Sequence, residues 1–395
     1  MNVPKLRFKE FTDKWQKVPL NLFTNIYGGY AFKSENLLNY KAKYQVIKMG
    51  NVNNNTLNLE KNPSYLNTIS QKELPYLLEK NDIILTLTGT FGKKDFGYSY
   101  QIKNETNLLL NQRLAVFKIT NSNYSANFLK YILLNNTFLN KFFRFSVGGT
   151  GNQANVSIQD IKSFKIPFPK LEEQNKIANF LTTVDKKITN LENTIISLEN
   201  QKKGLLQQIF SQKLRFKDKN GNNYPNWEKK KIGLICSIST GKSNTQDKID
   251  NGKYPFYVRS ATIERSSKYL YDEEATLTVG DGVGTGKVFH YVNGKYDLHQ
   301  RCYRMFNFKN THAKYFYYFF SSHFYNRVKR MSAKNSVDSV RMNMISDMII
   351  NLPCLEEQTK IADFLSAFDR KLDNQKAQLE HWKQIKKGLL QQMFV

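Results

Sequence analysis

An eleven-residue phrase occurs twice in this chain, as LEEQNKIANFL from Leu171 and as LEEQTKIADFL from Leu355. The two copies continue without a gap over residues 171–210 and 355–394, and 20 of the 40 aligned positions are identical. Identity is highest at the two ends of the repeat, and both copies close on KKGLLQQ followed by one apolar residue and a phenylalanine. An internal repeat of this strength defines the architecture of a chain. We therefore expect two equivalent halves.

The middle of each copy keeps only its apolar periodicity. Apolar residues recur at alternating steps of four and three, which is the a/d seam of a left-handed coiled coil. The predicted seam comprises Ile177, Leu181, Val184, Ile188, Leu191, Ile195 and Leu198 in the first copy and Ile361, Leu365, Phe368, Leu372, Leu379 and Trp382 in the second. Gln375 is the one polar residue on this seam between Ile361 and Trp382. The pattern predicts two helices of about 37 residues, each roughly 55 Å long, which pair with each other as an intramolecular antiparallel coiled coil.

Two lysines, Lys202 and Lys386, fall on this seam in the same register. A lysine close to a helix end commonly extends its ammonium group past the apolar surface into water, and we favour this interpretation. The alternative is that both lysines fix the register of the helix pair or the choice of partner.

A weaker repeat precedes each long helix and supports the division into halves. The stretch KLRFK occurs from Lys5 and again from Lys213, and each is followed by a tryptophan, Trp15 or Trp227. The first helix runs on into QKLRF, whereas the sequence ends on QQMFV and begins with MNVPKLRF, so its end reads as if it should continue into its beginning. This circular regularity favours a pseudo-twofold arrangement.

The segments between the helices also echo each other. Both contain the pattern Leu-x-Gln-Arg, as Leu110–Arg113 and as Leu298–Arg301, and both contain short β-prone runs followed by an aromatic helical pattern. Such segments predict mixed α+β modules. The predicted divisions are an N-terminal segment (1–15), a first module (16–170), a central spacer helix (171–212), a linker that repeats the N-terminal segment (213–226), a second module (227–354) and a C-terminal spacer helix (355–395).

The charge is distributed unevenly over these divisions. The chain has 59 Lys and Arg against 33 Asp and Glu, a formal net charge of +26. Residues 1–170 carry a net +13 and residues 211–354 a net +12, while the two helical repeats are close to neutral. A basic membrane-binding helix would concentrate its charge on the helices. Basic globular modules instead favour a polyanionic partner such as nucleic acid, with Lys and Arg on phosphates and Asn, Gln and Arg on base edges.

Nothing in the sequence indicates a membrane protein or a secreted one. No run approaches the roughly 18 apolar residues of a spanning helix, and the first residues lack the apolar stretch of a secretory signal. The three cysteines are widely spaced and form no CxxC pair, which indicates neither a disulfide framework nor a zinc site. We expect a cytoplasmic protein.

We find no catalytic motif. The triplet GKS at residues 241–243 lacks the glycine that a phosphate-binding loop needs five residues earlier, and the run GVGTG from Gly282 is not GxGxxG. The run predicts a tight hairpin or a backbone approach to phosphate. The five histidines form no HxxxH pair, and the acidic cluster Asp272–Glu274 is interpreted as a solvated turn. We therefore predict no catalytic residue and no metal ligand in this chain.

Taken together, the two LEEQxKIAxFL helices, each entered through KLRF and a tryptophan, resemble the specificity subunit of type I restriction-modification systems over essentially the whole chain. The resemblance implies that residues 16–170 and 227–354 are target-recognition domains, each of which reads one half of a split DNA sequence. It implies that the helices set the gap between the half-sites on double-stranded DNA and bind two modification subunits.

The resemblance further implies that the chain has no catalytic activity of its own. Methylation of adenine from S-adenosylmethionine and ATP- and Mg²⁺-dependent cleavage would belong to the modification and restriction subunits, with the restriction subunits bound through the modification subunits. No cofactor is expected in this chain.

Residues in the basic, turn-rich parts of each module are the candidate DNA contacts. They are Lys48, Lys93, Lys94, Gln112, Arg113, Arg144, Asn152 and Gln153 in the first module and Arg259, Lys287, Gln300, Arg301, Arg330, Lys334 and Arg341 in the second. For the echoed Gln-Arg pairs, a role in the shared fold competes evenly with a role in DNA reading. Two other functions remain open: an orphan DNA-binding scaffold or regulator, and a DNA methyltransferase or nuclease with a cryptic active site.

Overall fold

The computed structural model describes residues 3–148, 152–282, 284–331 and 339–395. These residues form two compact units: unit 1 comprises Met1–Leu191 and Gln378–Val395, and unit 2 comprises Glu192–Ala377. Each unit contains one α+β domain and a stretch of each of two long helices, α4 (Leu171–Phe210) and α8 (Leu355–Gln392). The predicted pair of long helices and the α+β class are confirmed, although both helices are somewhat longer than the periodicity indicated.

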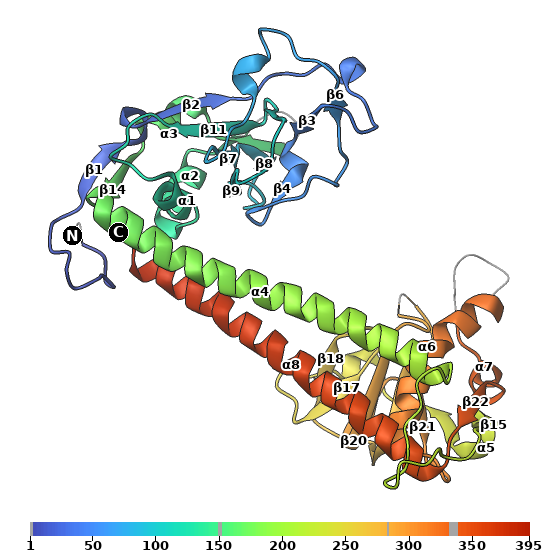
Figure 1. Ribbon diagram of the computed structural model, residues 1–395. Coiled ribbons are helices and arrows are strands. Elements are labelled where there is room, and N and C mark those ends of the chain that lie inside the picture. The colour runs from blue at the N-terminus through green and yellow to red at the C-terminus, as the bar shows by residue number, and fades with distance from the viewer. Residues whose placement is uncertain (1–2, 149–151, 283, 332–338) are drawn as a thin grey trace. The chain divides into compact units, whose positions relative to one another are not determined.

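The domain of unit 1 is built on an antiparallel four-stranded sheet of order β2-β11-β7-β9, whose strands are labelled in Figure 1. Two smaller sheets have the orders β10-β3-β6 and β12-β13-β8. Its strands are β1 (Gln16–Pro19), β2 (Thr24–Gly28), β3 (Tyr44–Ile47), β4 (Val52–Asn53), β5 (Thr56–Leu57), β6 (Tyr65–Leu66), β7 (Ile83–Thr86), β8 (Thr88–Thr90), β9 (Ser99–Gln101), β10 (Leu108–Leu110), β11 (Leu114–Ile119), β12 (Val147–Gly148), β13 (Gln153–Asn155) and β14 (Lys165–Phe168). Its shorter helices are α1 (Ala126–Leu133), α2 (Asn136–Arg144) and α3 (Ile158–Ser163).

The domain of unit 2 is built on one six-stranded sheet of order β16-β21-β19-β20-β17-β18. Its strands are β15 (Glu228–Lys231), β16 (Ser237–Thr240), β17 (Tyr254–Tyr257), β18 (Ile263–Ser266), β19 (Tyr271–Val279), β20 (Phe289–Leu298), β21 (Cys302–Phe306) and β22 (Ile349–Leu352). Its shorter helices are α5 (Ile232–Ile235), α6 (Ala313–Met331) and α7 (Met342–Ser346).

The two domains share one topology. Strand β11 pairs antiparallel with β2 and β7, as β21 pairs antiparallel with β16 and β19. A parallel strand pair also matches, because β10 runs parallel to β3 and β20 runs parallel to β17. Each domain is closed by an antiparallel pair, β1 with β14 or β15 with β22. The echo in the sequence therefore reflects a repeated fold.

Each unit has its own apolar core, and the long helices contribute to both. In unit 1, Phe394 meets Trp15 with the ring centroids 6.3 Å apart, and Leu181 of α4 is fully buried in the same cluster. In unit 2, Phe210 meets Tyr315 at 5.8 Å, and Leu365 of α8 is fully buried. Burial of large aromatic side chains is the main apolar contribution to such cores.

An arginine, a tryptophan and a buried glutamate fasten the segment before the domain of unit 1 to the start of α4. Arg7 donates from Nε and Nη2 to the two carboxylate oxygens of Glu173, both at 2.8 Å, and Trp15 Nε1 donates to the same carboxylate at 3.2 Å. Glu173 is only 2% exposed. Because a buried carboxylate needs partners for its lone pairs, all three side chains depend on one another.

The same clamp recurs in unit 2. Arg215 donates from Nε and Nη2 to the carboxylate of Glu357 at 3.1 and 2.8 Å, and Trp227 Nε1 donates to it at 2.9 Å. We call these two sets, Arg7–Trp15–Glu173 and Arg215–Trp227–Glu357, the Arg–Trp–Glu clamps. They explain why KLRF, the tryptophan and the second glutamate of LEEQ are repeated together.

The glutamine of LEEQ also has a structural role in both units. The side-chain oxygen of Gln174 accepts from the backbone N–H of Ser125 at 2.8 Å, and that of Gln358 accepts from the backbone N–H of His312 at 2.8 Å. Both glutamines are 1% exposed. Each one satisfies a backbone donor just before α1 or α6 that would otherwise be buried without a partner.

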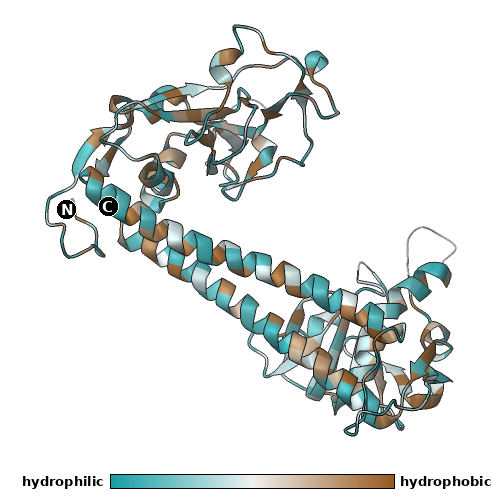
Figure 2. Cartoon of the chain, in the orientation of Figure 1, coloured by the Kyte–Doolittle hydropathy of each residue, from teal (hydrophilic) through white to brown (hydrophobic). Residues whose placement is uncertain are grey.

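The two long helices pack antiparallel within each unit. Figure 2 shows hydrophobic positions recurring along both helices between hydrophilic ones. Of the predicted seam, Ile177, Leu181, Val184, Leu191, Ile195, Leu198, Ile361, Leu365 and Leu372 are buried, and Ile188, Phe368, Leu379 and Trp382 are half-buried. The predicted antiparallel coiled coil is confirmed.

The lysines on the seam do not extend past the apolar surface into water, so the favoured interpretation was wrong. In unit 1, Lys386 of α8 pairs with Asp185 of α4 at 2.7 Å, and Tyr131 donates to the same carboxylate at 2.8 Å. Burial alone would raise the pKa of Asp185, but the charges of Lys386 and Lys130 outweigh burial and lower it.

Unit 2 contains the reciprocal arrangement. Lys202 of α4 pairs with Asp369 of α8, and Tyr318 donates to that carboxylate at 2.6 Å. Residues 202 and 386, like residues 185 and 369, are equivalent positions of the repeat. Each helix therefore supplies a lysine in one unit and an aspartate in the other, which is possible only in an antiparallel register.

The junction between the long helices and the KLRF segments is also repeated. In unit 2, the backbone N–H of Leu214 donates to the carbonyl of Gln208 at 3.1 Å, six residues earlier in the chain. In unit 1, the N–H of Leu6 donates to the carbonyl of Gln392 at 2.9 Å. The predicted continuity between the two ends of the sequence is thus present as a hydrogen bond.

Candidate DNA-binding surface

The Leu-x-Gln-Arg motif forms the same tight turn in both domains, immediately before the central strand β11 or β21. The N–H of Leu114 donates to the carbonyl of Asn111 at 3.0 Å, and the N–H of Cys302 donates to the carbonyl of His299 at 2.9 Å. These i to i+3 hydrogen bonds place the glutamine and the arginine at the two central positions of a β-turn. The main chain of the motif is therefore part of the fold.

A glycine packs against each turn. In unit 1, strand β2 ends at Gly28 and is followed by Gly29. In unit 2, strand β16 ends at Thr240 and is followed by Gly241. A Cβ atom on Gly29 would lie 2.3 Å from the Asn111 backbone, and one on Gly241 would lie 2.2 Å from the carbonyl oxygen of Leu298. Only glycine allows two backbones to approach so closely.

The side chains at the centre of the turns point to the surface. Gln112, Arg113, Gln300 and Arg301 are all exposed. The two roles considered for the motif therefore belong to different parts of it. The backbone stabilises the fold, and the glutamine and arginine side chains are exposed to a partner.

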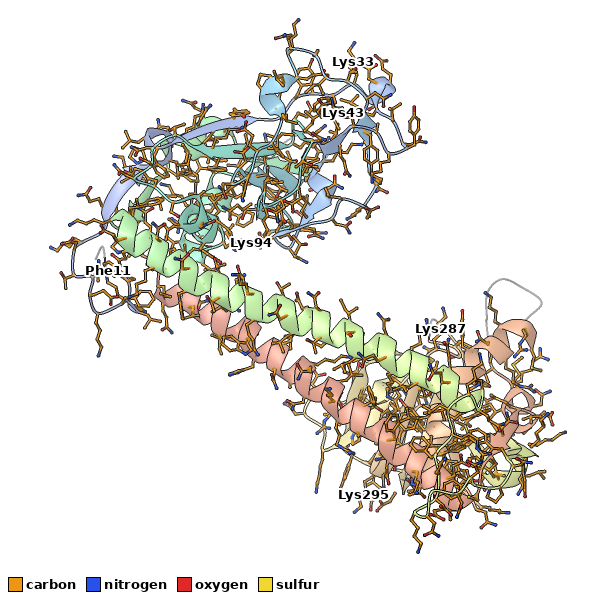
Figure 3. All side chains as sticks on the ribbon, in the orientation of Figure 1. Phe11, Lys33, Lys43, Lys94, Lys287 and Lys295 are labelled. Atoms are coloured by element: carbon orange, nitrogen blue, oxygen red, sulfur yellow. The ribbon has the colours of Figure 1, made fainter. Side chains whose placement is uncertain are left out.

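In unit 1, the turn lies beside a small sheet with an apolar surface. Phe91 and Val147 are 56% and 68% exposed, although both are hydrophobic. The ring of Phe91 lies over Gly148, where a Cβ atom would be 3.3 Å from it. The candidate contacts Lys93 and Lys94 follow Phe91 in the same loop and are exposed (Figure 3 labels Lys94). Exposed apolar side chains next to lysines fit a groove contact better than a solvated loop.

In unit 2, the equivalent region carries arginines around an acid. Asp281, which follows β19, lies 3.6 Å from Nη1 of Arg259 and 3.7 Å from Nε of Arg301. Gln300 donates from Nε2 to the side-chain oxygen of Asn244. Lys287, labelled in Figure 3, is exposed with its ammonium group 5.3 Å from the centre of the Tyr325 ring.

The other candidates are less concentrated. Lys48 is half-buried and donates to Ser64 Oγ at 2.6 Å, so its side chain supports a loop of unit 1. Arg144, Asn152, Gln153, Arg330 and Arg341 are exposed. Lys334 lies outside the described residues. The structure thus brings together Arg259 and Arg301 in unit 2. In unit 1 it places Asn152 and Gln153 beside the Phe91 loop, because the Phe91 N–H donates to the Asn152 carbonyl at 3.0 Å and Gln153 pairs with Thr90. Lys48 and Arg330 lie on other segments.

Sequence reasoning missed three side chains of these surfaces: Asp281, Asn244 and Phe91. Asp281 was overlooked because an acid is an unexpected member of a basic DNA-binding face. The available signal was its position directly after Gly280, at the end of an apolar strand-like run.

A histidine and a cysteine lie at the turn of unit 2. His299 accepts at Nδ1 from the Arg301 backbone N–H at 3.0 Å, and its pKa is lowered by burial and by the charge of Arg259. Burial raises the pKa of the Cys302 thiol to about 12, which leaves it unreactive. No group of three or more potential metal ligands occurs among the described residues.

The prediction that the acidic cluster Asp272–Glu274 forms a solvated turn was wrong, because these residues belong to strand β19. Glu273 accepts from Arg304 Nη1 at 2.5 Å and from the Tyr296 hydroxyl at 2.8 Å, within a partly buried network.

In the part of the chain that the structure describes, no helix is both long enough and apolar enough to cross a membrane.

Comparisons with known proteins agree with the division of the chain into two halves. The family model for the type I restriction modification DNA specificity domain matches residues 12–200 and again residues 224–381, once for each half of the chain. The chain is 22% identical over 412 residues to the putative MjaX specificity subunit of Methanocaldococcus jannaschii, covering 98% of this chain and 95% of that one. It is 26% identical over 352 residues to the MjaVIII specificity subunit of the same organism, covering 82% of this chain and 80% of that one.

A match to the EcoDI specificity subunit of Escherichia coli is 25% identical but spans only 36% of that protein. Among solved structures, the S subunit of a type I restriction-modification system from M. genitalium superposes with a TM-score of 0.68 at 17% identity, covering 100% of this chain and 99% of that one. At this identity, the likeness concerns the fold.

Proposed function

The chain belongs to the type I restriction-modification DNA specificity family, and from this premise we propose that each of its two domains is a target-recognition domain that reads one half of a bipartite DNA site. Unit 1 would read one half-site and unit 2 the other. The observation that carries the proposal is the repeated Gln-Arg turn, which has one backbone structure in both domains and different neighbouring side chains.

The charge and chemistry of the two surfaces support DNA as the ligand. Both domains are strongly basic and expose Arg, Lys and Gln side chains close to the turns. Lysines and arginines bind phosphates without regard to sequence, whereas Arg and Gln on a rigid turn can recognise base edges. The differences between the two surfaces are what two unlike half-sites require.

The reaction chemistry would belong to partner subunits. We propose that this chain is non-catalytic and binds two modification subunits through the long helices, with the restriction subunits held through them in the cytoplasm. S-adenosylmethionine, ATP and Mg²⁺ would then act in the partners.

The most direct test is modified-base sequencing of a host that expresses this chain with its modification subunit. We expect a two-part motif with one methylated adenine on each strand. An undivided motif, or methylation without any sequence preference, would exclude this function.

We further propose that the long helices set the gap between the two half-sites. Deleting one heptad from α4 and the matching heptad from α8 shortens each helix by about 10 Å, which is roughly three base pairs of B-DNA. The methylated motif should keep both half-sites and change its gap. An unchanged gap would show that the helices do not act as a ruler.

An enzyme with a cryptic site is the main competing function. Purified chain incubated with DNA, S-adenosylmethionine and Mg²⁺ should give neither methylated nor cleaved DNA. Product formed by the chain alone would favour the enzyme.

A further inference from the structure

We propose that Asp281 is a positioning residue that holds Arg259 and Arg301 in the orientation needed to read one G·C base pair in the half-site of unit 2. The inference rests on the proposed function and deepens it, because it assigns a base-reading element to one of the two domains. The three residues come from three separate segments: Arg259 follows β17, Asp281 follows β19, and Arg301 precedes β21.

The geometry gives each arginine its own oxygen of the carboxylate. Arg259 Nη1 lies 3.6 Å from Asp281 Oδ1, and Arg301 Nε lies 3.7 Å from Oδ2. The arginine side chains are 51% and 64% exposed, whereas that of Asp281 is 27% exposed. The acid therefore lies underneath, and both guanidinium groups keep surface that a ligand can reach.

The glycines around Asp281 are required by the same two arginines. A Cβ atom on Gly280 would lie 2.6 Å from the carbonyl oxygen of Arg301, and one on Gly284 would lie 2.8 Å from the carbonyl oxygen of Arg259. Both distances are shorter than real Cβ contacts allow. The glycine-rich sequence is thus explained without a nucleotide: it lets one loop pack against the main chain of both arginines.

The backbone of Asp281 is fixed on both sides. The Gly280 N–H donates to the Arg301 carbonyl at 2.8 Å, and the Gly280 carbonyl accepts from the Val340 N–H at 2.6 Å. Asp281 itself pairs with Ser339 in an antiparallel bridge. Since these main-chain contacts on Gly280 and Asp281 hold its Cα in place, the carboxylate is a fixed reference point for the two long arginine side chains.

An acid at this place favours base reading over phosphate binding. A carboxylate is repelled by phosphates and cancels part of the charge that two arginines would bring to them. What it adds is orientation: a guanidinium group recognises O6 and N7 of guanine through two parallel hydrogen bonds, and both must be aligned. Holding the side chains in place before binding also reduces the conformational entropy lost on binding.

Unit 1 provides an internal contrast. The N–H of Leu87 donates to the Arg113 carbonyl and its carbonyl accepts from the Val156 N–H, both at 3.1 Å. These hydrogen bonds make Leu87 equivalent to Gly280, and therefore Thr88 equivalent to Asp281. A hydroxyl occupies the position of the acid, so the inference applies to unit 2 alone.

The test uses the complex of the full chain with its modification subunits and modified-base sequencing of genomic DNA. With Asp281→Asn, we expect the preference for one G·C pair, in one half-site only, to fall about 5- to 100-fold, as for the loss of one good bidentate contact. Asp272→Asn is the matched control, because it makes the same charge change at an exposed position on β19. The control should leave the motif unchanged.

Arg259→Lys and Arg301→Lys carry the test if Asp281→Asn does not assemble, since both keep the charge and lose the planar fork. Relaxation at the same base pair as expected for Asp281→Asn supports the proposal. A uniform decrease at all sites, with a weaker salt dependence, would mean phosphate contacts and would overturn it, as would an unchanged motif. If the wild-type complex gives no bipartite motif, the proposed function itself fails, which is distinct from a bipartite motif that these variants leave intact.

Discussion

Units 1 and 2 are nearly identical at their Arg–Trp–Glu clamps and differ at their Gln-Arg turns. At the clamp, Glu173 and Glu357 have the same partners in the same roles. At the turn, the backbone is the same, but an exposed Phe91 accompanies one and an acid, Asp281, accompanies the other. The comparison separates the residues that build the repeated scaffold from those that distinguish the two units.

The clamps also differ in one respect that bears on stability. The KLRF segment of unit 2 is joined to α4 by a short stretch of chain, whereas that of unit 1 meets α8 through the hydrogen bond between Leu6 and Gln392. Noncovalent attachment leaves more entropy to be lost on folding. The same clamp should therefore matter more for the order of the KLRF segment in unit 1.

The largest effect should follow from removing a clamp carboxylate. Glu173→Ala and Glu357→Ala each leave a guanidinium group and an indole N–H without their partner, which costs about 3–5 kcal/mol for a buried ion pair. Chemical denaturation would measure this loss. Hydrogen exchange should show deprotection of α1 in the first variant and of α6 in the second, and the KLRF segment should be released further by Glu173→Ala.

Equal release of the two KLRF segments would contradict the difference between the units. Glu172→Ala is a suitable control, since this residue precedes Glu173 on α4 and has no part in the clamp. Its unfolding free energy should be close to that of the wild type.

A smaller effect is expected at the ion pairs between the long helices. Asp185→Asn leaves Lys386 and Lys130 without their carboxylate, and Asp369→Asn does the same to Lys202. Hydrogen bonds to charged groups contribute about 1.5–3 kcal/mol. Denaturation should show a loss in this range for each variant, and the double exchange Lys202→Asp with Asp369→Lys should recover part of it.

The Asp185 pair also predicts a pH dependence. Because the pKa of Asp185 is lowered in the folded state, its contribution is fully present above its unfolded value of about 3.9 and is lost as the pH falls through the folded value. The difference in unfolding free energy between wild type and Asp185→Asn should therefore be constant near pH 6 and shrink below about pH 4. If this difference in unfolding free energy grew on acidification, the pKa of Asp185 would be raised on folding and not lowered.

Recognition should be affected one half-site at a time. Arg113→Ala and Arg301→Ala remove equivalent exposed side chains, and a base contact contributes about 1–3 kcal/mol of discrimination. Modified-base sequencing should show that each variant relaxes a different half of the motif. If both relaxed the same half, the assignment of one half-site to each unit would be wrong.

The long helices and the division into halves could be predicted from the sequence. Buried residues such as Ile177 and Leu181 recur at a regular spacing along the chain, and this spacing can be seen without the structure. The partners of Glu173 could not be predicted, since Arg7 lies 166 residues away and only the tertiary fold joins them. Lys202 was misread for a related reason. Its environment depends on which residue of the facing helix lies opposite, and the pattern of one helix does not contain that information.

The candidate recognition surface could be predicted from the sequence only in part, for a physical reason. The rule that basic residues bind DNA selects Arg259 and Arg301 as candidates, but it passes over the acid Asp281, for which we propose an orienting role. The repeat helped only indirectly, because it identified the turn on which the arginines lie. Comparing the two halves of the sequence identifies the residues that they share, so it does not identify side chains such as Asp281 that occur in one half alone.

The smallest predicted effect would make unit 1 resemble unit 2. Thr88→Asp places a carboxylate at the position equivalent to Asp281, beside Arg113, on a backbone that already has the same hydrogen bonds. An exposed ion pair stabilises by about 0.2–1 kcal/mol, so the gain in orientation should be modest and the loss of positive charge should offset part of it. Sequencing should show a shift in base preference of a few fold at one position of the half-site that Arg113→Ala affects. Thr88→Asn, which has nearly the same shape without the charge, should show no such shift, and an equal response from both variants would mean that the acid orients nothing.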